Sequence, residues 1–189
     1  MRTKRIVAIG FSILAISFYA CNGDKDNKGA AGMSRQTCID SMNAIDSKLK
    51  NITTPDPVSY GKAITAWTNF ATNFPNDTLA PVCLFRAASF ASSLNQYQRA
   101  LSLYDTIAKK YPNFYKAAEC AFSHGNIYED KMKDTAKARV YYQLVLDKYP
   151  KDQWAMQARF ALKNLGKTPD EIINSFPSKD SDKDGSGTK

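Results

Sequence analysis

His124 is the only histidine among the 189 residues, and so the only side chain whose ordinary pKa suits acid–base catalysis near neutral pH. A catalytic histidine also needs a nucleophile and an acidic group that orients its ring. His124 instead lies between Ala121 and Gly125 at helical spacing, and the pattern suggests no nucleophile with an orienting acid nearby. We predict a structural histidine, no catalytic residue and no enzymatic activity.

The four cysteines, Cys21, Cys38, Cys83 and Cys120, could bind metal or form disulfides. No two of them form the close Cys-x-x-Cys pair that is typical of zinc sites, so we expect no metal and no cofactor. If Cys21 is lipidated, the other three allow one disulfide at most. Cys83 and Cys120 occupy equivalent positions in successive helical units, where side chains lie about 8 to 10 Å apart, beyond the roughly 7 Å that a disulfide spans between α-carbons. We expect buried thiols.

Asp180, Asp182, Asp184 and Gly185 match the opening of a calcium-binding loop. The glutamate that closes such a loop at its twelfth position is missing, since the sequence ends at Lys189. Only Ser, Asp, Lys, Gly and Thr occur from residue 178 onward. We predict a disordered tail over residues 177–189 rather than a calcium site.

The N-terminal segment has the features of an export signal. Three basic residues precede an uncharged stretch from Ile6 to Ala20, which is shorter than the roughly 18 to 20 residues that cross a bilayer. The stretch ends in Phe18-Tyr19-Ala20-Cys21, which resembles a lipobox, although Tyr19 is larger than the usual residue there. We predict a lipoprotein signal peptide over residues 1–20 and lipidation of Cys21. Ordinary cleavage after Ala15-Ile16-Ser17 is the alternative.

Residues 21–33 are polar and contain glycine, with no apolar period, so we expect a flexible tether. A tether behind a lipidated cysteine implies attachment to a membrane. By resemblance to the sorting of enteric lipoproteins, Asn22 after the cysteine indicates the outer membrane, and we expect the periplasmic face.

An aromatic-proline step recurs at Phe74-Pro75, Tyr111-Pro112 and Tyr149-Pro150. The separations of 37 and 38 residues predict stacked two-helix units rather than one closed core. An alanine stands twelve residues before each proline and an aromatic residue eight before it, one turn apart on one helix face. These pairs form the predicted repeat core: Ala63 and Trp67, Ala100 and Tyr104, Ala138 and Tyr142.

A second register lies upstream in each unit, with a small residue where two helices would cross: Leu84, Ala87 and Ala88, then Ala121, His124 and Gly125. At these residues the chain resembles the tetratricopeptide repeat family, over roughly residues 57–166, although Ala88 and Lys163 replace the consensus glycine. Units longer than the usual 34 residues look like the periplasmic lipoprotein branch of that family, such as the β-barrel assembly lipoprotein and the Tol-Pal-associated cell-division coordinator. The resemblance implies an all-α helix-turn-helix repeat solenoid.

Local signals divide residues 34–176 into about three such units and a C-terminal capping helix. Asp56 and Pro57 predict a helix start, and residues 94–96 a turn. We expect residues 130–134 to form a turn one residue longer, which would account for the period of 38. Gly166 favours a helix stop, and Thr168 with Glu171 has capping-box spacing. The last helix is expected to bring three apolar side chains back onto the stack: Ile172, Ile173 and Phe176.

Phenylalanine recurs in the first helices, at Phe85, Phe122 and Phe160. The family often has an aromatic residue there that lines its concave surface, and the analogy adds a polar residue one turn further on: Ser89, Asn126 and Asn164. The resemblance thus implies a groove for a peptide or helix with regularly spaced anchors. The alternative, that the phenylalanines pack helix against helix, stays open.

The formal net charge of +8 falls to +5 once Arg2, Lys4 and Arg5 are removed with the signal peptide. The later half is basic, and we interpret its charges as a solvated face interleaved with Asp130, Asp134 and Asp147. Nine residues make it so: Lys131, Lys133, Lys137, Arg139, Lys148, Lys151, Arg159, Lys163 and Lys167.

Together these features predict a lipid-anchored envelope scaffold that binds proteins or peptides and, being exported, no nucleic acid. The second hypothesis is a module that binds an anionic envelope polymer, peptidoglycan or lipopolysaccharide, through its basic face.

Replacing Cys21 with serine should release the protein from the membrane, because stable anchoring needs multiple acyl chains and the variant has no site for them. Fractionation and labelled fatty-acid incorporation measure this. Membrane retention of the variant, with no label in the wild type, would remove the lipoprotein hypothesis.

Overall fold

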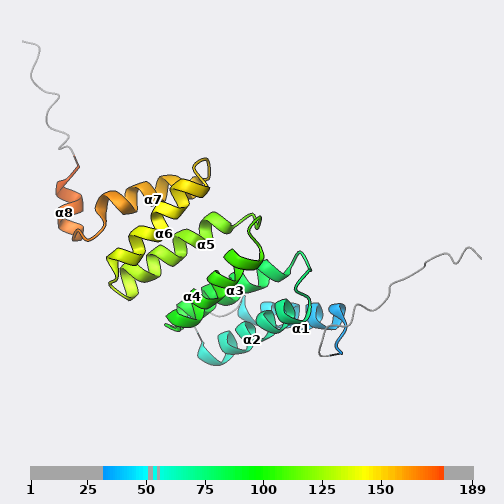
Figure 1. Ribbon diagram of the computed structural model, residues 1–189. Coiled ribbons are helices and arrows are strands. Elements are labelled where there is room, and N and C mark those ends of the chain that lie inside the picture. The colour runs from blue at the N-terminus through cyan, green and yellow to red at the C-terminus, as the bar shows by residue number, and fades with distance from the viewer. Residues whose placement is uncertain (1–31, 51–52, 55, 177–189) are drawn as a thin grey trace, which may run out of the picture.

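The computed structural model describes residues 32–50, 53–54 and 56–176, and all regular elements within these ranges are helices. Lipidation at Cys21, the signal peptide, most of the tether and the predicted tail over residues 177–189 lie outside the described residues. The all-α repeat solenoid is confirmed (Figure 1). Its elements are α1 Arg35–Leu49, α2 Pro57–Asn73, α3 Ala80–Ser93, α4 Tyr97–Lys110, α5 Ala117–Asn126, the π-helix η1 Ile127–Lys131, α6 Thr135–Lys148, α7 Gln153–Asn164 and α8 Pro169–Asn174.

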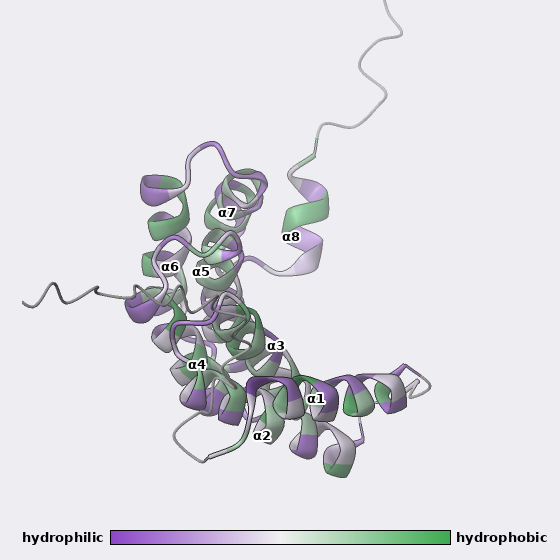
Figure 2. Cartoon of the chain, turned by 90° about the vertical axis from the view of Figure 1, so that its right-hand side faces the viewer, coloured by the Kyte–Doolittle hydropathy of each residue, from purple (hydrophilic) through white to green (hydrophobic). Residues whose placement is uncertain are grey.

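The helices form three consecutive pairs, α1–α2, α3–α4 and α5–α6, followed by α7 and α8. Each helix from α1 to α7 packs on its neighbours along the chain, so the pairs stack in chain order (Figure 1). In Figure 2, α1 and α2 form one arm of the molecule and α5, α6 and α7 the other, so the stack turns along its length. No described helix is long and apolar enough to cross a membrane.

The repeat-core residues lie on the second helix of each pair, and none is more than 3% exposed. Alanine at three of these positions keeps the facing helices close, while Trp67, Tyr104 and Tyr142 fill the space one turn away. The buried residues form two clusters, one from α1 to α5 and one from α5 to α7. Tyr128 packs against both clusters and joins them.

The closest crossing in the stack is that of α5 and α6 at Gly125. A β-carbon on Gly125 would lie 2.5 Å from the Tyr142 ring, so no larger residue fits without movement. The ring crosses the α5 backbone, and its hydroxyl reaches Asn126 Oδ1 at 2.7 Å and Glu129 Oε2 at 2.6 Å. Burial raises the pKa of Tyr142, and the hydrogen bond to Glu129 adds to this rise.

The expected longer turn at residues 130–134 is wrong, because the extra residue lies inside the helix. Both turns have three residues and a left-handed residue at the same place, Asn95 with φ 59° and Lys133 with φ 55°. The π-helix Ile127–Lys131 widens the end of α5 by one residue instead. The closing hydrogen bonds show this shift directly, since Gln96 N donates to Ala91 O and Asp134 N donates to Tyr128 O.

The helix signals near the chain breaks are confirmed. The Asp56 carboxylate accepts from Ser59 N at 2.8 Å, with Pro57 in the first turn of α2. Gly166 has φ 84° just after α7. Thr168 and Glu171 form both hydrogen bonds of a capping box at the start of α8. The expected packing of α8 is wrong for two of its three apolar residues: Ile172 is half-buried, but Ile173 and Phe176 are 65% and 58% exposed. The helix that packs on the last pair is α7.

Two arginines fix α1 to the second pair. Arg35 forms an ion pair with Asp77, which lowers the pKa of that carboxyl, and Asp77 Oδ1 also accepts from Leu79 N at 2.8 Å. Arg86 of α3 binds both Asp46 oxygens at 2.7 Å, and its guanidinium lies 4.2 Å from the centre of the Trp67 ring. These contacts place α1 against α3 as well as α2.

Replacing Gly125 with alanine should destabilise the protein by about 1 to 3 kcal/mol, because the new methyl group would meet the Tyr142 ring. Gly61→Ala is the matched control, since that helical position has open space and the change should stabilise by about 0.4 to 1 kcal/mol. Urea unfolding of both variants measures the difference. Equal shifts would show that the α5–α6 crossing is loose.

Candidate functional site

A hollow of about 270 Å³ lies between the first helices of two successive units. Ser89 and Ser92 come from α3, and residues 123–131 of α5 and η1 form the opposite wall. We call it the serine groove and define it by eight residues: Ser89, Ser92, Tyr104, Ser123, Asn126, Ile127, Asp130 and Lys131.

The floor of the serine groove is Tyr104 of α4, which is 3% exposed. Burial raises the pKa of Tyr104, while Ser89 and Ser123 oppose the rise through their hydrogen bonds. The phenol therefore stays neutral at physiological pH. Its contacts with Ser89 and Ser123 tie the floor to both walls.

Hydrogen bonds also fix the orientation of the walls. Ser89 Oγ donates to Phe85 O at 3.1 Å within its own helix. Asn126 Oδ1 accepts from the Tyr142 hydroxyl, which fixes the amide. Asp130 and Lys131 belong to the π-helix and place one negative and one positive side chain at the same end of the groove.

The structure brings together the polar members of the predicted groove but not its phenylalanines. Ser89 and Asn126 line the serine groove. The centre of the Phe85 ring lies 6.2 Å from that of Tyr104 and 6.4 Å from that of Phe114. The Lys116 ammonium lies 4.8 Å from the centre of the Phe85 ring. Phe85 therefore packs within its own helix pair and against the start of the next unit, and it does not line the groove.

The remaining members of the predicted set lie towards the C-terminal end. Phe122 packs against Tyr142 at 5.4 Å and Trp154 at 4.9 Å, so it joins α5 to α6 and α7. Phe160 is 50% exposed. Asn164 is 6% exposed and donates to Phe160 O at 3.0 Å, which leaves it within its own helix. The sequence ladder thus combines groove residues with residues that pack between units.

Ser92, Ser123, Asp130 and Lys131 were not predicted as groove residues. They do not recur at the repeat period, because Glu129 stands opposite Ser92 in the next unit and Arg86 opposite Ser123 in the previous one. The only signal in the sequence concerns the two serines, which stand in alanine-rich helices.

His124 is packed in an aromatic cluster and is 3% exposed. Its ring stacks on Tyr141 at 4.0 Å and lies 5.9 Å from both Tyr104 and Tyr128. Nε2 has no hydrogen-bond partner, since Asp105 Oδ1 is 3.7 Å away. Burial lowers the pKa of His124 to about 4, and Asp105 only partly opposes the change. The imidazole is therefore neutral at pH 7 and structural.

The cysteines have the character expected of packed thiols. Cys83 and Cys120 are buried and free, and burial raises the pKa of each to about 12. Both stay protonated at neutral pH and are poor nucleophiles. Cys38 is free and half-buried. Within the described residues, no group of three or more His, Cys, Asp or Glu side chains could hold a metal ion.

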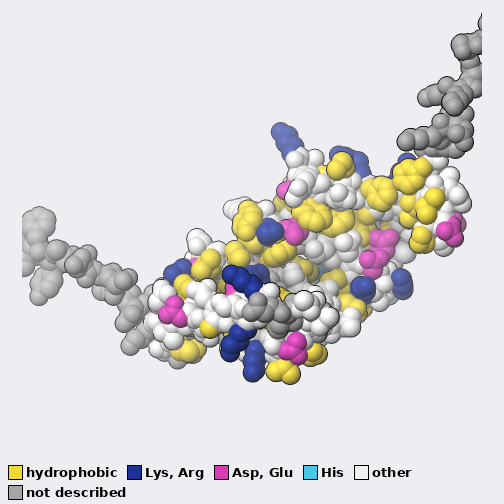
Figure 3. Space-filling view, turned by 180° about the vertical axis from the view of Figure 1, so that it is seen from behind, with side chains coloured by type: hydrophobic (Ala, Val, Ile, Leu, Met, Phe, Trp, Pro, Cys, Tyr) yellow, Lys and Arg dark blue, Asp and Glu magenta, His cyan; other side chains and the backbone are white. Residues whose placement is uncertain are grey.

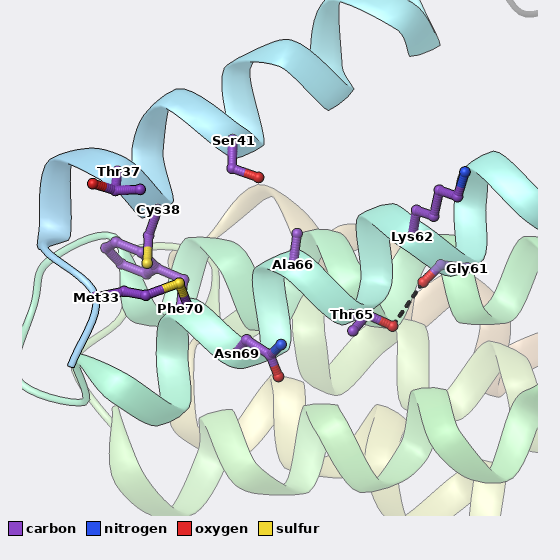
Figure 4. A pocket seen from close by; sticks show the side chains of 10 residues that line it. All are labelled: Met33, Thr37, Cys38, Ser41, Gly61, Lys62, Thr65, Ala66, Asn69 and Phe70. Atoms are coloured by element: carbon purple, nitrogen blue, oxygen red, sulfur yellow. Dashed lines mark hydrogen bonds between the residues drawn. The ribbon is translucent and has the colours of Figure 1, made fainter. Parts of the chain in front are cut away.

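A second hollow of about 520 Å³ lies between α1 and α2 and is mostly apolar (Figure 4). We call it the end groove. Met33, Cys38 and Phe70 lie close together at one end, and Lys62 lies at the other. Ten residues line it: Met33, Thr37, Cys38, Ser41, Gly61, Lys62, Thr65, Ala66, Asn69 and Phe70.

Comparison with protein families agrees with the geometry of the paired helices. The tetratricopeptide repeat model matches residues 83–113 and residues 114–152, which correspond to α3–α4 and to α5–α6 with the intervening η1. These two stretches are therefore similar to tetratricopeptide repeats. No curated protein shows significant similarity to the chain.

The serine groove lies between these two stretches that are similar to tetratricopeptide repeats. Such repeats commonly bind proteins or peptides and generally act as scaffolds rather than enzymes. The groove contains hydroxyl, amide, carboxylate and ammonium groups but no activated nucleophile, so its chemistry suits hydrogen bonding to a ligand.

Acidification should destabilise the wild type through His124. Its folded-state pKa of about 4 lies below the ordinary value of 6.5, so the unfolded chain binds more protons between those pH values and stability falls as pH falls. From pH 7 to pH 5 this loss is about 1 to 2 kcal/mol.

The matched variant is His124→Phe, which keeps an aromatic ring beside Tyr141 but cannot titrate. Urea unfolding at pH 7 and pH 5 should show the wild type losing more stability than the variant. Other titrating groups are common to both chains, so parallel pH profiles would mean that His124 is not held neutral by burial.

Proposed function

We propose that this protein is a lipid-anchored scaffold of the cell envelope that binds a segment of another envelope protein in the serine groove. The tetratricopeptide repeats indicate a protein-interaction scaffold. The observation that carries the proposed site is the convergence of polar side chains from both repeats over the buried Tyr104.

The groove chemistry favours the main chain of the ligand. Serine hydroxyls and the asparagine amide both donate and accept hydrogen bonds, as peptide groups require. Ile127 is the only aliphatic residue in the lining and is 5% exposed, so it offers little surface to an apolar anchor. The ligand is therefore a polar segment held by hydrogen bonds, with Asp130 and Lys131 selecting charges at one end.

The anchoring part of the proposal rests on the lipobox-like Phe18-Tyr19-Ala20-Cys21 and the polar stretch behind it. Lipidated Cys21 would hold the repeats at a membrane through residues 22–33, with Asn22 favouring the outer membrane and its periplasmic face. A scaffold tethered in this way meets its partner at high local concentration.

A second candidate function is binding of an anionic envelope polymer, peptidoglycan or lipopolysaccharide. All nine basic residues of the later half are exposed, and Lys137 is the one of these nine that forms an ion pair within the described part of the chain, with Asp134 at 3.1 Å. Polymer binding through these charges should weaken steeply with salt, whereas binding in the serine groove should depend on salt much less.

Ser92→Arg should weaken partner binding about tenfold or more, because a long charged side chain would fill the groove. The partner is first identified in cells with a photo-cross-linking residue at Ser123, and affinity is then measured by titration calorimetry. Ser93→Arg is the matched control, since Ser93 is exposed beside the same turn but does not line the groove.

Both variants should melt close to the wild-type temperature, because neither position is buried. Equal binding by the two variants would contradict the serine groove. Loss of binding in high salt with both variants unaffected would favour the polymer-binding function.

A further inference from the structure

The end groove lies on the face of the first helix pair that corresponds to a buried face in the later pairs. Cys38, Cys83 and Cys120 each stand four residues after the N-cap of their helix, at Ser34, Leu79 and Lys116. Cys83 and Cys120 are 5% and 3% exposed, and Cys83 Sγ lies 3.7 Å from Met42 Sδ of the preceding pair. Cys38 is only half-buried and lines the end groove, which no described element covers.

The opposite end of the stack has apolar side chains without a cover. Phe122 packs on Trp154 of the helix that follows, whereas Phe160, at the same repeat position, has no aromatic partner among the described residues and is 50% exposed. Met156 on α7 is 66% exposed, and Ile173 on α8 and Phe176 just after α8 are exposed as well. Figure 3 shows hydrophobic side chains gathered at this end.

We propose that the end groove of one copy of this chain receives α8 of a second copy, so that copies join head to tail. Ile173 lies on α8 and Phe176 lies two residues after its end, where Phe176 N still donates to Ile173 O at 3.2 Å. Both side chains are exposed at the same end of the chain, which suits an apolar hollow. The six residues of α8 span about 9 Å, and the end groove lies between two longer helices, α1 with 15 residues and α2 with 17.

The charges of the two surfaces are complementary. The end groove contains Lys62 and no acidic residue. The first turn of α8 contains Asp170 and Glu171 and no basic residue. Pairing of two C-terminal ends is disfavoured in comparison, because α7 of each copy carries Arg159 and Lys163 and these like charges would face each other.

The second copy is the occupant because α8 cannot reach the end groove of its own chain. The two surfaces lie at opposite ends of the stack (Figure 1). A contact between different surfaces of identical chains leaves one groove and one α8 unused in a dimer, so further copies can add and the assembly does not stop at a closed pair. The inference does not depend on what binds in the serine groove.

Sedimentation velocity of the full chain, in reducing buffer over a concentration series, tests the assembly. The wild type should form dimers and longer species as concentration rises. Ile173→Asp should weaken association about tenfold or more, because it puts a charge on the apolar side of α8. Gly61→Glu should have an effect of similar size, because it puts a negative charge in the end groove opposite Asp170. Gly61→Glu adds no clash, because its β-carbon would meet nothing within 4 Å.

The decisive sample mixes the two variants. The Gly61→Glu chain keeps its α8 and the Ile173→Asp chain keeps its end groove, so the mixture should form dimers and nothing longer. Val140→Asp is the control, since Val140 is 64% exposed on α6, away from both ends, and should assemble like the wild type.

Disulfide trapping gives an independent measurement. Ile173→Cys should form an intermolecular disulfide with Cys38 under mild oxidation, and Cys38→Ser should abolish it, while Val140→Cys should not cross-link to Cys38. The buried Cys83 and Cys120 do not compete.

Three outcomes would overturn the proposal. A wild type that stays monomeric at every concentration would mean that the preceding residues of the same chain, or nothing, occupy the end groove. Association lost with Ile173→Asp but kept with Gly61→Glu would mean that C-terminal ends pair with each other. A disulfide that forms equally well from residue 140 would mean random collision.

Discussion

The contact on which the stack depends is an aromatic ring from the second helix lying on a small residue of the first. At Gly125 the Tyr142 ring leaves no room for a β-carbon. The hydroxyl of the same ring donates to Asn126 at the end of α5 and contacts Glu129 of η1. The same contact therefore sets the distance between the helices and holds a groove residue in place.

In the preceding unit Ala88 and Tyr104 hold the equivalent positions, and there the ring ends as the floor of the serine groove. The same contact between an aromatic ring and a small residue thus shapes both a wall and the floor of the serine groove. Tyr142 orients Asn126 in the groove wall, and Tyr104 supplies the base between Ser89 and Ser123. A change of helix spacing in either unit would alter the groove, because its walls belong to α3 and α5 while its floor belongs to α4.

The π-helix shows how an inserted residue can leave a stack intact. Had the extra residue entered the turn, the left-handed position held by Asn95 and Lys133 would have shifted, and α6 would have met α5 in a different relation from α4 and α3. The π-helix absorbs the residue before the turn and carries Asp130 and Lys131 into the groove wall. The insertion thus gives this groove a charged end.

The parts of the fold that depend on neighbouring residues could be predicted from the sequence. Helix starts at Asp56 and Thr168 and the stop at Gly166 are local, and the alanine and aromatic ladder follows from helical period alone. The position of the inserted residue was not local, because a longer turn and a π-helix satisfy the same spacing. The exposed face of α8 was also mistaken, since capping signals form a helix without determining what it packs against.

The candidate site was harder to predict, because a residue that recurs at the repeat period need not be exposed to a ligand. Phe85 and Phe122 recur and are covered by the unit that follows, while Phe160 recurs and is half exposed because no described helix follows in that place. A repeating residue therefore identifies the contact between units, whatever its chemistry. The residues that distinguish one unit from the next, Ser92 and Ser123, face the shared hollow and cannot be found from the period. In a stack of similar units, the information that selects a partner lies where the repeat is broken.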